Sequence, residues 1–216
     1  MTDSIRLDGR VAVITGAAGL IGAATMRLLA ARGARIVAID RREQDLNAAI
    51  AALPASAEPL AIAADVTDEA QVAAYVQRAC DQFGTIDVFF NNAGIEGEIK
   101  SITDYPLEAF RRVLDVNVVG VFLGLKHVLP VMLQQNRGSI INTASIAGLI
   151  DSRMLSAIIE GRSGAPVPID RIVDRVPARR LGQGSEVAAI VAFLASDDAS
   201  YVSGAAYTVD GGRTAA

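Results

Sequence analysis

The chain has 216 residues, of which 51% are hydrophobic and 20% are charged, and its formal net charge at pH 7 is −4. This composition excludes a disordered chain, and the length suits one domain that is large enough to bury a core. The weakly acidic balance argues against nucleic acid and anionic membrane surfaces as partners. The first residues hold no apolar secretory signal, and no uninterrupted apolar run reaches the about 18 residues of a membrane span. We therefore expect a cytoplasmic protein without a membrane partner.

A glycine-rich turn follows the first apolar run of the chain. Val11–Ile14 is a short, partly β-branched run typical of a buried strand, and apolar residues repeat at helical spacing from Ile21 to Gly33. Such a turn leaves backbone N–H groups free at the positive end of a helix, where they accept a phosphate or pyrophosphate. Similar turns also occur where nothing binds. The residues that we assign to cofactor binding here are Gly16, Gly19, Leu20, Ile21 and Gly22.

An acidic residue follows the second strand-like run, Arg35–Ile39. Asp40 lies 18 residues beyond Gly22, about where a dinucleotide site places the acid that accepts hydrogen bonds from the adenosine ribose. A solvated loop charge is the alternative interpretation. Arg41 comes next and belongs to the same predicted site, since arginine there can hold a 2′-phosphate. The Asp40 carboxylate would repel that phosphate at short range, so we predict NAD rather than NADP as the cofactor.

Helical and strand-like segments alternate through most of the remaining chain. The expected helices are 43–53, Asp68–Phe83, Asp104–Gln135 with a kink at Pro130, and Glu186–Ala195. The expected further strands are Leu60–Ala64, Ile86–Phe90, Ser139–Ala144 and Ala205–Val209. Strict alternation predicts an α/β fold with a Rossmann-type, doubly wound parallel sheet in a single domain, residues 1–216, with ligands at the carboxyl ends of the strands.

The alternation breaks down between Ala147 and Ser185. Only two short helical fragments are recognisable there, near Met154–Glu160 and Ile169–Arg175. So long a weakly structured stretch is usually a lid or a binding loop. We interpret residues 150–183 as a substrate loop or lid.

The motifs together resemble the short-chain dehydrogenase/reductase family, over nearly the whole chain. They are the glycine turn, Asp65-Val66, Asn91-Asn92-Ala93-Gly94, Asn117 on the long helix, Ser145 after the fifth strand, and Asp210-Gly211-Gly212. The resemblance implies a nicotinamide cofactor, hydride exchange between a small-molecule alcohol and its ketone, and a homo-oligomer. Residues 89–97 and 194–202 are similar to levodione-reductase-like members, which points to cyclic ketones or secondary alcohols.

The resemblance also assigns roles to individual residues. Asp65 and Val66 would flank the adenine, while Asn92, Ala93 and Gly94 would line the ribose on the nicotinamide side. Two residues are predicted to be catalytic: Asn117 would hold a proton-relay water, and Ser145 would orient the substrate carbonyl. The alternatives are that Ser145 caps a loop and that Asn117 satisfies backbone groups at a helix kink. We assign no metal site.

The sequence departs from the family pattern in two places. Leu20 stands where the usual spacing has its middle glycine, and its β-carbon would crowd the pyrophosphate. The family also uses a tyrosine as proton donor, with a lysine four residues later that lowers the tyrosine pKa. None of the four tyrosines has a lysine at that spacing, and the only lysines are Lys100 and Lys126.

The missing pair belongs to a helix and a strand that would fit between Leu149 and Ile150. A unit of roughly 30 residues or more is therefore missing from the pattern, which would leave the last strand without its usual neighbour. Three functions remain open at this point: an NAD-dependent oxidoreductase that interconverts a secondary alcohol and its ketone, a truncated and catalytically silent dinucleotide-binding relative, and a nucleotide-free structural or interaction protein.

Overall fold

The computed structural model describes residues 5–145, 150, 155 and 168–215. Its centre is a five-stranded sheet in the order β3-β2-β1-β4-β5, in which every pair of neighbours is parallel. The strands are β1 Val11–Thr15, β2 Arg35–Asp40, β3 Leu60–Ala63, β4 Val88–Asn91 and β5 Ser139–Asn142. The order reverses between β1 and β4, so the predicted doubly wound α/β fold in a single domain is confirmed.

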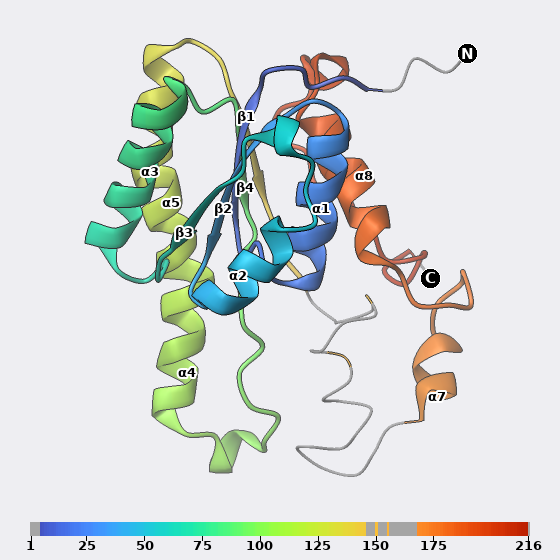
Figure 1. Cartoon of the computed structure of the whole chain (residues 1–216). Helices are drawn as coiled ribbons and strands as arrows, with labels where there is room; N and C mark the ends of the chain where they lie inside the picture. Colours follow the sequence, from blue (N-terminus) through green and yellow to red (C-terminus); the bar gives the residue numbers. More distant parts are fainter. Residues whose placement is uncertain (1–4, 146–149, 151–154, 156–167, 216) are drawn as a thin grey trace.

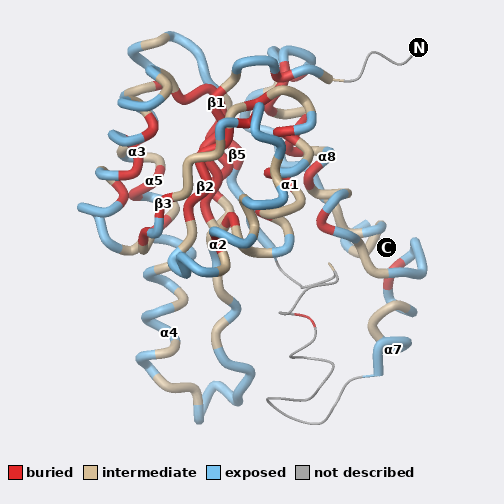
Figure 2. Tube along the Cα trace, viewed as in Figure 1, coloured by how far each residue is buried: buried red, intermediate tan, exposed pale blue. Residues whose placement is uncertain are grey.

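Helices cover both faces of the sheet (Figure 1). One face carries α1 Leu20–Ala31, α2 Glu43–Ile50 and α8 Gly184–Leu194, and the other carries α3 Glu69–Phe83 and α5 Gly120–Gln134. Successive side chains of a strand point to opposite faces, so Ala12 and Ile14 enter one core while Val11 and Val13 enter the other. Figure 2 shows that burial is concentrated along these strands.

The predicted long helix is one continuous helix over Leu107–Gln134, with an irregularity that periodicity did not predict. It consists of α4 Leu107–Leu114, a π-helical turn η3 Asp115–Val119, and α5, which contains Pro130. The expected start at Asp104 is wrong, because Ile102–Asp104 forms a separate 3-10 turn, η2.

The same helix is long and apolar enough to span a bilayer by length and composition alone, although charged and polar residues interrupt its apolar sequence. A core helix of a globular protein can have the same length and composition. Leu123, Val128 and Met132 of α5 are buried in the core against the sheet. The apolar composition of the helix is in part explained by this packing.

The predicted strand Ala205–Val209 is wrong: these residues are not part of any strand. A strand needs a neighbour about 4.8 Å away, and the sheet ends at β5, whose outer edge is separated from residues 203–209 by a cavity. Residues 205–209 form no strand because the strand that would pair with them is missing from the sequence.

Other boundaries differ by a few residues. The helix α2 ends at Ile50 rather than at 53, β5 ends at Asn142 rather than at Ala144, and α7 spans only Ile169–Val173. Of the predicted fragment Met154–Glu160, only Leu155 lies within the described residues. Short 3-10 turns complete the fold, η1 at Ala55–Ala57 and η4 at Asp197–Ala199.

Candidate functional site

The turn between β1 and α1 presents a set of free backbone donors. The Ala17 N–H donates to Ile39 O at 3.0 Å, and the first hydrogen bond of α1 runs from the Ala23 N–H to Gly19 O at 2.8 Å. The N–H groups of residues 20–22 come before that bond, and none of them has a partner within the described part of the chain. No acidic side chain lies in the first turn of α1. This end of the helix can therefore accept an anion.

Two glycines make this turn sterically possible. Gly16 adopts a φ of +64°, and a β-carbon there would lie 3.0 Å from Ala93 Cα. A β-carbon on Gly22 would lie 2.2 Å from Gly16 O, closer than any real contact. Both glycines are therefore needed for the turn to lie this close to the start of α1 and to the end of β4.

Asp40 is brought directly to this turn. Its Oδ2 accepts a hydrogen bond from the Ala18 N–H at 3.0 Å, and its Oδ1 accepts one from the Arg42 N–H at 3.3 Å. The half-buried carboxylate therefore orders the turn. The guanidinium of Arg42 is paired with Asp45 at 2.9 Å, whereas Arg41 is exposed.

Thr15, which sequence reasoning did not assign, joins the ends of β1 and β4. Its buried Oγ1 accepts hydrogen bonds from the Asn92 N–H at 2.9 Å and the Ala93 N–H at 3.0 Å. The Asn92 side chain returns a hydrogen bond to Thr15 O at 3.0 Å and accepts one from Thr143 Oγ1 at 3.2 Å. The carboxyl ends of β1, β4 and β5 are therefore linked by one polar network. The signal in the sequence that could have indicated this network is a hydroxyl residue, Thr15, at the end of an apolar strand.

Asn117 lies in the π-helical turn and holds the loop that follows β4. Its Oδ1 accepts from the Ile95 N–H at 2.9 Å, and its Nδ2 donates to Ile95 O at 2.8 Å. Gly94 lies beside it, since a β-carbon there would be 3.4 Å from Asn117 Oδ1. The side chain satisfies backbone groups, as in the alternative interpretation, and its role toward a relay water stays a prediction.

Asp65 and Val66 follow β3 at the same edge of the sheet. The Asp65 Oδ1 accepts from the Thr67 N–H at 2.9 Å and from its hydroxyl at 2.8 Å. Val66 packs on Gly120, where a β-carbon would lie 2.9 Å from Val66 Cγ2. Both residues are half-buried, and their contact with an adenine stays a prediction.

Leu20 and Ser145 lie at the edges of the site. The Leu20 side chain is 46% exposed and contacts the start of α8, because a β-carbon on Gly184 would lie 3.1 Å from Leu20 Cδ2. Gly184 therefore gives this leucine space, and sequence reasoning did not assign it a role. Ser145 is exposed three residues beyond β5 and lines the cavity next to that strand.

Both lysines of the chain pair with acidic side chains, Tyr75 and Tyr105 lie in other parts of the fold, and Tyr201 is fully exposed. Tyr75 is buried in α3, where desolvation raises the pKa of its phenol, and the Tyr105 hydroxyl accepts from the Glu98 N–H at 3.0 Å. Lys100 pairs with Glu98 and Lys126 with Glu69, each at 2.6 Å. The expected tyrosine–lysine pair therefore has no counterpart among them.

Comparisons with known proteins identify relatives along the whole chain. The family model described as short chain dehydrogenase matches residues 10–157, and the model described as Enoyl-(Acyl carrier protein) reductase matches residues 147–214. Levodione reductase of Leifsonia aquatica is 37% identical over 98% of this chain and 96% of its own length. Cyclohexanol dehydrogenase of Acinetobacter sp. (strain SE19) is 35% identical over 98% and 97%.

Solved structures give the same result. A crystal structure of levodione reductase superimposes with a TM-score of 0.90 at 34% identity, covering 98% of this chain and 100% of that one. An NAD+-bound xylitol dehydrogenase superimposes with a TM-score of 0.86 at 30% identity, covering 95% and 99%.

The alignments also bear on the missing unit. The alignment with levodione reductase extends over 257 residues, whereas this chain has 216. The relative therefore has residues without a counterpart here, as the sequence pattern predicts. The position of the missing helix and strand, between Leu149 and Ile150, stays a prediction. By the extent of the match and the identity to its relatives, the chain belongs to the short-chain dehydrogenase family.

Proposed function

We propose that this protein is an NAD-dependent oxidoreductase of a secondary alcohol, cyclic in particular, and its ketone. The observation that carries the proposal is the pairing of three free N–H groups at the start of α1 with the Asp40 carboxylate that binds the same turn. Such a pairing suits a diphosphate and its adjoining ribose. The relatives named for levodione and cyclohexanol support the substrate class.

The residues around the turn fit a dinucleotide. The N–H groups of residues 20–22 would hold the diphosphate, Asp40 the adenosine ribose, and Asp65 and Val66 the adenine. The segment 92–94 would line the second ribose. NAD is favoured over NADP, because Asp40 opposes a 2′-phosphate and Arg42 is already paired with Asp45. When bound, the nicotinamide supplies or accepts the hydride.

The substrate side of the reaction rests on Ser145 and Asn117. Ser145 would orient the carbonyl oxygen, and Asn117 would fix the loop at Ile95 that borders the cofactor. Ketone reduction also needs a proton donor, and the chain has no tyrosine with a lysine four residues later. That absence favours a second candidate function: a dinucleotide-binding relative that does not turn over.

Titration of the purified protein with NADH tests the cofactor site. We expect binding in the micromolar range, weakened at least tenfold by Asp40→Ala, because the ribose and the Ala18 N–H both lose their acceptor. The control is Asp45→Ala on α2, which removes only the partner of Arg42 and should leave the affinity for NADH nearly unchanged. Equal affinity of the Asp40→Ala variant would exclude the assigned site.

Turnover separates the two candidate functions. Production of NADH from NAD and cyclohexanol, lost in Ser145→Ala, is the expected result for the oxidoreductase. NADH binding without turnover of this or related cyclic alcohols would instead identify the silent relative. Cyclohexanol is used at saturating concentration, so that the rate of NADH production does not depend on how tightly the alcohol binds.

A further inference from the structure

Leu20 is the first residue of α1, the helix whose start we assign to the diphosphate. Side chains of a helix tilt toward its N-terminus, so a side chain at the first position extends toward the region in front of the free N–H groups. In the family pattern this position is a glycine, which leaves that region open. The place that the Leu20 side chain occupies therefore decides whether a diphosphate can reach the N–H groups of residues 20–22.

The Leu20 side chain lies against Gly184, the first residue of α8. A β-carbon added to Gly184 would lie 3.1 Å from Leu20 Cδ2, 3.1 Å from Leu20 O and 3.3 Å from Ala24 Cβ. Each of these distances is shorter than an ordinary van der Waals contact of a β-carbon. The tip of Leu20 thus occupies space that any residue other than glycine at position 184 would need for its own side chain.

The backbone of Gly184 does not itself require glycine. Its φ lies outside the left-handed region, in contrast to the φ of +64° at Gly16. Glycine is also less favourable than alanine within a helix. The space beside Leu20 is therefore what the absence of a side chain at position 184 provides.

The two helices are held in place on both sides of this contact. The start of α1 is fixed by Gly22, where a β-carbon would lie 2.2 Å from Gly16 O. Figure 1 shows α8 alongside α1, and Val191 and Ala192 of α8 are buried in the same core as Met26 of α1. The flexible tip of Leu20 is therefore the part of the contact that moves most easily.

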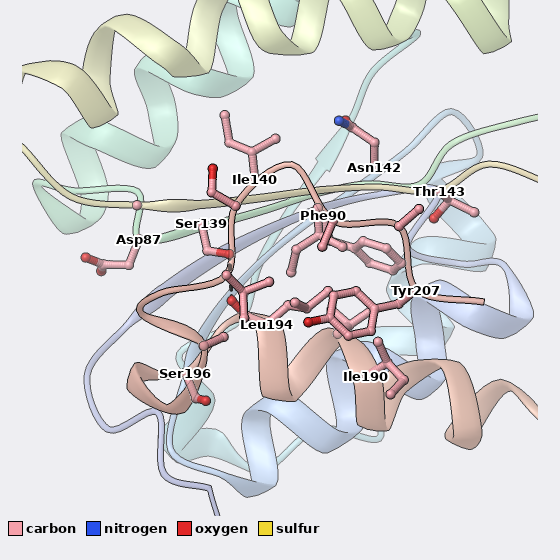
Figure 3. A pocket seen from close by; sticks show the side chains of 18 of the residues that line it. Asp87, Phe90, Ser139, Ile140, Asn142, Thr143, Ile190, Leu194, Ser196 and Tyr207 are labelled. Atoms are coloured by element: carbon pink, nitrogen blue, oxygen red, sulfur yellow. Dashed lines mark hydrogen bonds between the residues drawn. The ribbon is translucent and has the colours of Figure 1, made fainter. Parts of the chain in front are cut away.

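The far end of α8 is bound to the sheet. Leu194 O accepts a hydrogen bond from Ser139 Oγ of β5 at 2.7 Å, and Figure 3 shows the two residues side by side. Ile190 and Leu194 lie next to Tyr207 at the cavity beside β5 (Figure 3). Helical spacing places Ile190 and Leu194 on a different face of α8 from Gly184. The contact between Gly184 and Leu20 is therefore separate from that cavity.

We propose that Gly184 is a positioning residue of the cofactor site. It gives the Leu20 side chain a place against α8 and thereby keeps the N–H groups of residues 20–22 open to a diphosphate. The inference rests on the proposed function, because it requires a dinucleotide at this turn. It explains how the chain has a leucine at the position of the family's middle glycine and still presents free donors there.

A double-mutant cycle on NADH binding tests the proposal. Gly184→Val should push the tip of Leu20 over the free N–H groups and weaken NADH binding about tenfold, the effect of losing one hydrogen bond to a charged group. Leu20→Ala alone should bind NADH at least as tightly as the wild type. The double variant should bind NADH within about twofold of Leu20→Ala, because no side-chain tip is left to displace.

A smaller substitution covers the case in which valine prevents folding. Gly184→Ala adds only the β-carbon and requires a smaller shift of Leu20. It should weaken NADH binding in the same direction but by less, and Leu20→Ala should again restore the affinity.

Adenosine distinguishes positioning from a general loss of structure. It carries the ribose that we assign to Asp40 but no phosphate, so its affinity, measured by NMR titration, should be the same for the wild type and for the Gly184 variants. Val191→Ala is the control for packing between α1 and α8. It should lower the free energy of unfolding and leave the affinity for NADH nearly unchanged.

Four results would overturn the inference while leaving the cofactor site in place. They are an unchanged NADH affinity in both Gly184 variants, a loss that Leu20→Ala does not relieve, an equal loss for adenosine, and a loss in Leu20→Ala alone. The last result would mean that the leucine itself holds the cofactor. A wild-type protein that binds no NADH would instead overturn the proposed function, and this inference with it.

Discussion

Thr15 illustrates how the site is built at the scale of single residues. Its buried hydroxyl is the acceptor for the N–H groups of Asn92 and Ala93, which lie 77 and 78 residues away in the sequence. Replacing it by the isosteric valine would leave two partly buried donors without an acceptor. The energetic cost of unsatisfied donors therefore applies twice at this position.

We expect Thr15→Val to lower the free energy of unfolding by about 1–3 kcal/mol, measured by urea denaturation. Thr143→Val is the matched control, because the Thr143 side chain is exposed and gives up only one hydrogen bond, to Asn92 Oδ1. Equal losses in the two variants would contradict the role assigned to Thr15.

The residues that sequence could predict at this site are those defined by local spacing. The glycines of the turn and Asp40 stand at fixed distances from strands that apolar runs reveal, and the structure brings them together. The clamp between Asn117 and Ile95 could not be predicted in the same way. It joins residues 22 apart through a side chain whose partner depends on how the helix packs.

At the scale of elements, the N-terminus of α8 is capped by hydrogen bonds that depend on one carboxylate, Glu186. Glu186 accepts from the Gln183 N–H at 2.9 Å in a capping box, and its carboxylate pairs with Arg180 at 2.6 Å. The Arg180 guanidinium and the Gln183 N–H lower the pKa of Glu186 to about 2 from 4.5. The lowered pKa means that the stabilisation is fully present above about pH 4.5 and is lost as the pH falls toward about 2.

We expect Glu186→Gln to lower the urea midpoint at neutral pH and to reduce the difference from the wild type as the pH falls below 4.5. Parallel denaturation curves at neutral pH and at about pH 3 measure that difference. Glu43→Gln in the first turn of α2 is the control, since no hydrogen bond or ion pair of its side chain occurs in the described chain. A gap between wild type and Glu186→Gln that is independent of pH would contradict the linkage.

Elements differed in how well the sequence predicted them. Apolar periodicity correctly predicted the helix over Leu107–Gln134, but a π-helical turn differs from an α-helical one by a single extra residue and leaves no clear pattern. The segment Ala205–Val209 has strand-forming residues, yet it forms no strand because no neighbour pairs with it. Local preference was sufficient for the first element and not for the second.

At the scale of the whole molecule, an apolar stripe along the long helix supports the predicted homo-oligomer. Its exposed side chains are Leu107, Phe110, Leu114, Val118, Phe122, Leu129 and Leu133. Val118 and Phe122 lie on either side of Gly120, and Leu107 and Leu133 lie at equal distances from it at the ends of the stripe. Two copies related by a two-fold axis could therefore pack this helix against itself in antiparallel orientation.

We expect light scattering to give an oligomer for the wild type and a smaller species for Phe122→Glu, because a buried carboxylate opposes association. Phe122 is 58% exposed in the single chain, so the variant should keep its fold. Gln134→Glu adds the same charge on an exposed polar position of the same helix and should leave the mass unchanged. An unaltered mass for Phe122→Glu would place any interface elsewhere.

The wide turn at Asp115–Val119 sets the phase between the two halves of the long helix. Each residue advances a regular helix by about 100°, so the extra residue turns α4 about its own axis relative to α5 by roughly that amount. Shortening the turn by one residue would rotate Phe110 and Leu114 out of line with Phe122 and would swing Asn117 away from Ile95. The extra residue of this turn thus aligns an outer surface and a loop beside the proposed cofactor site at the same time, so a change to one is expected to change the other.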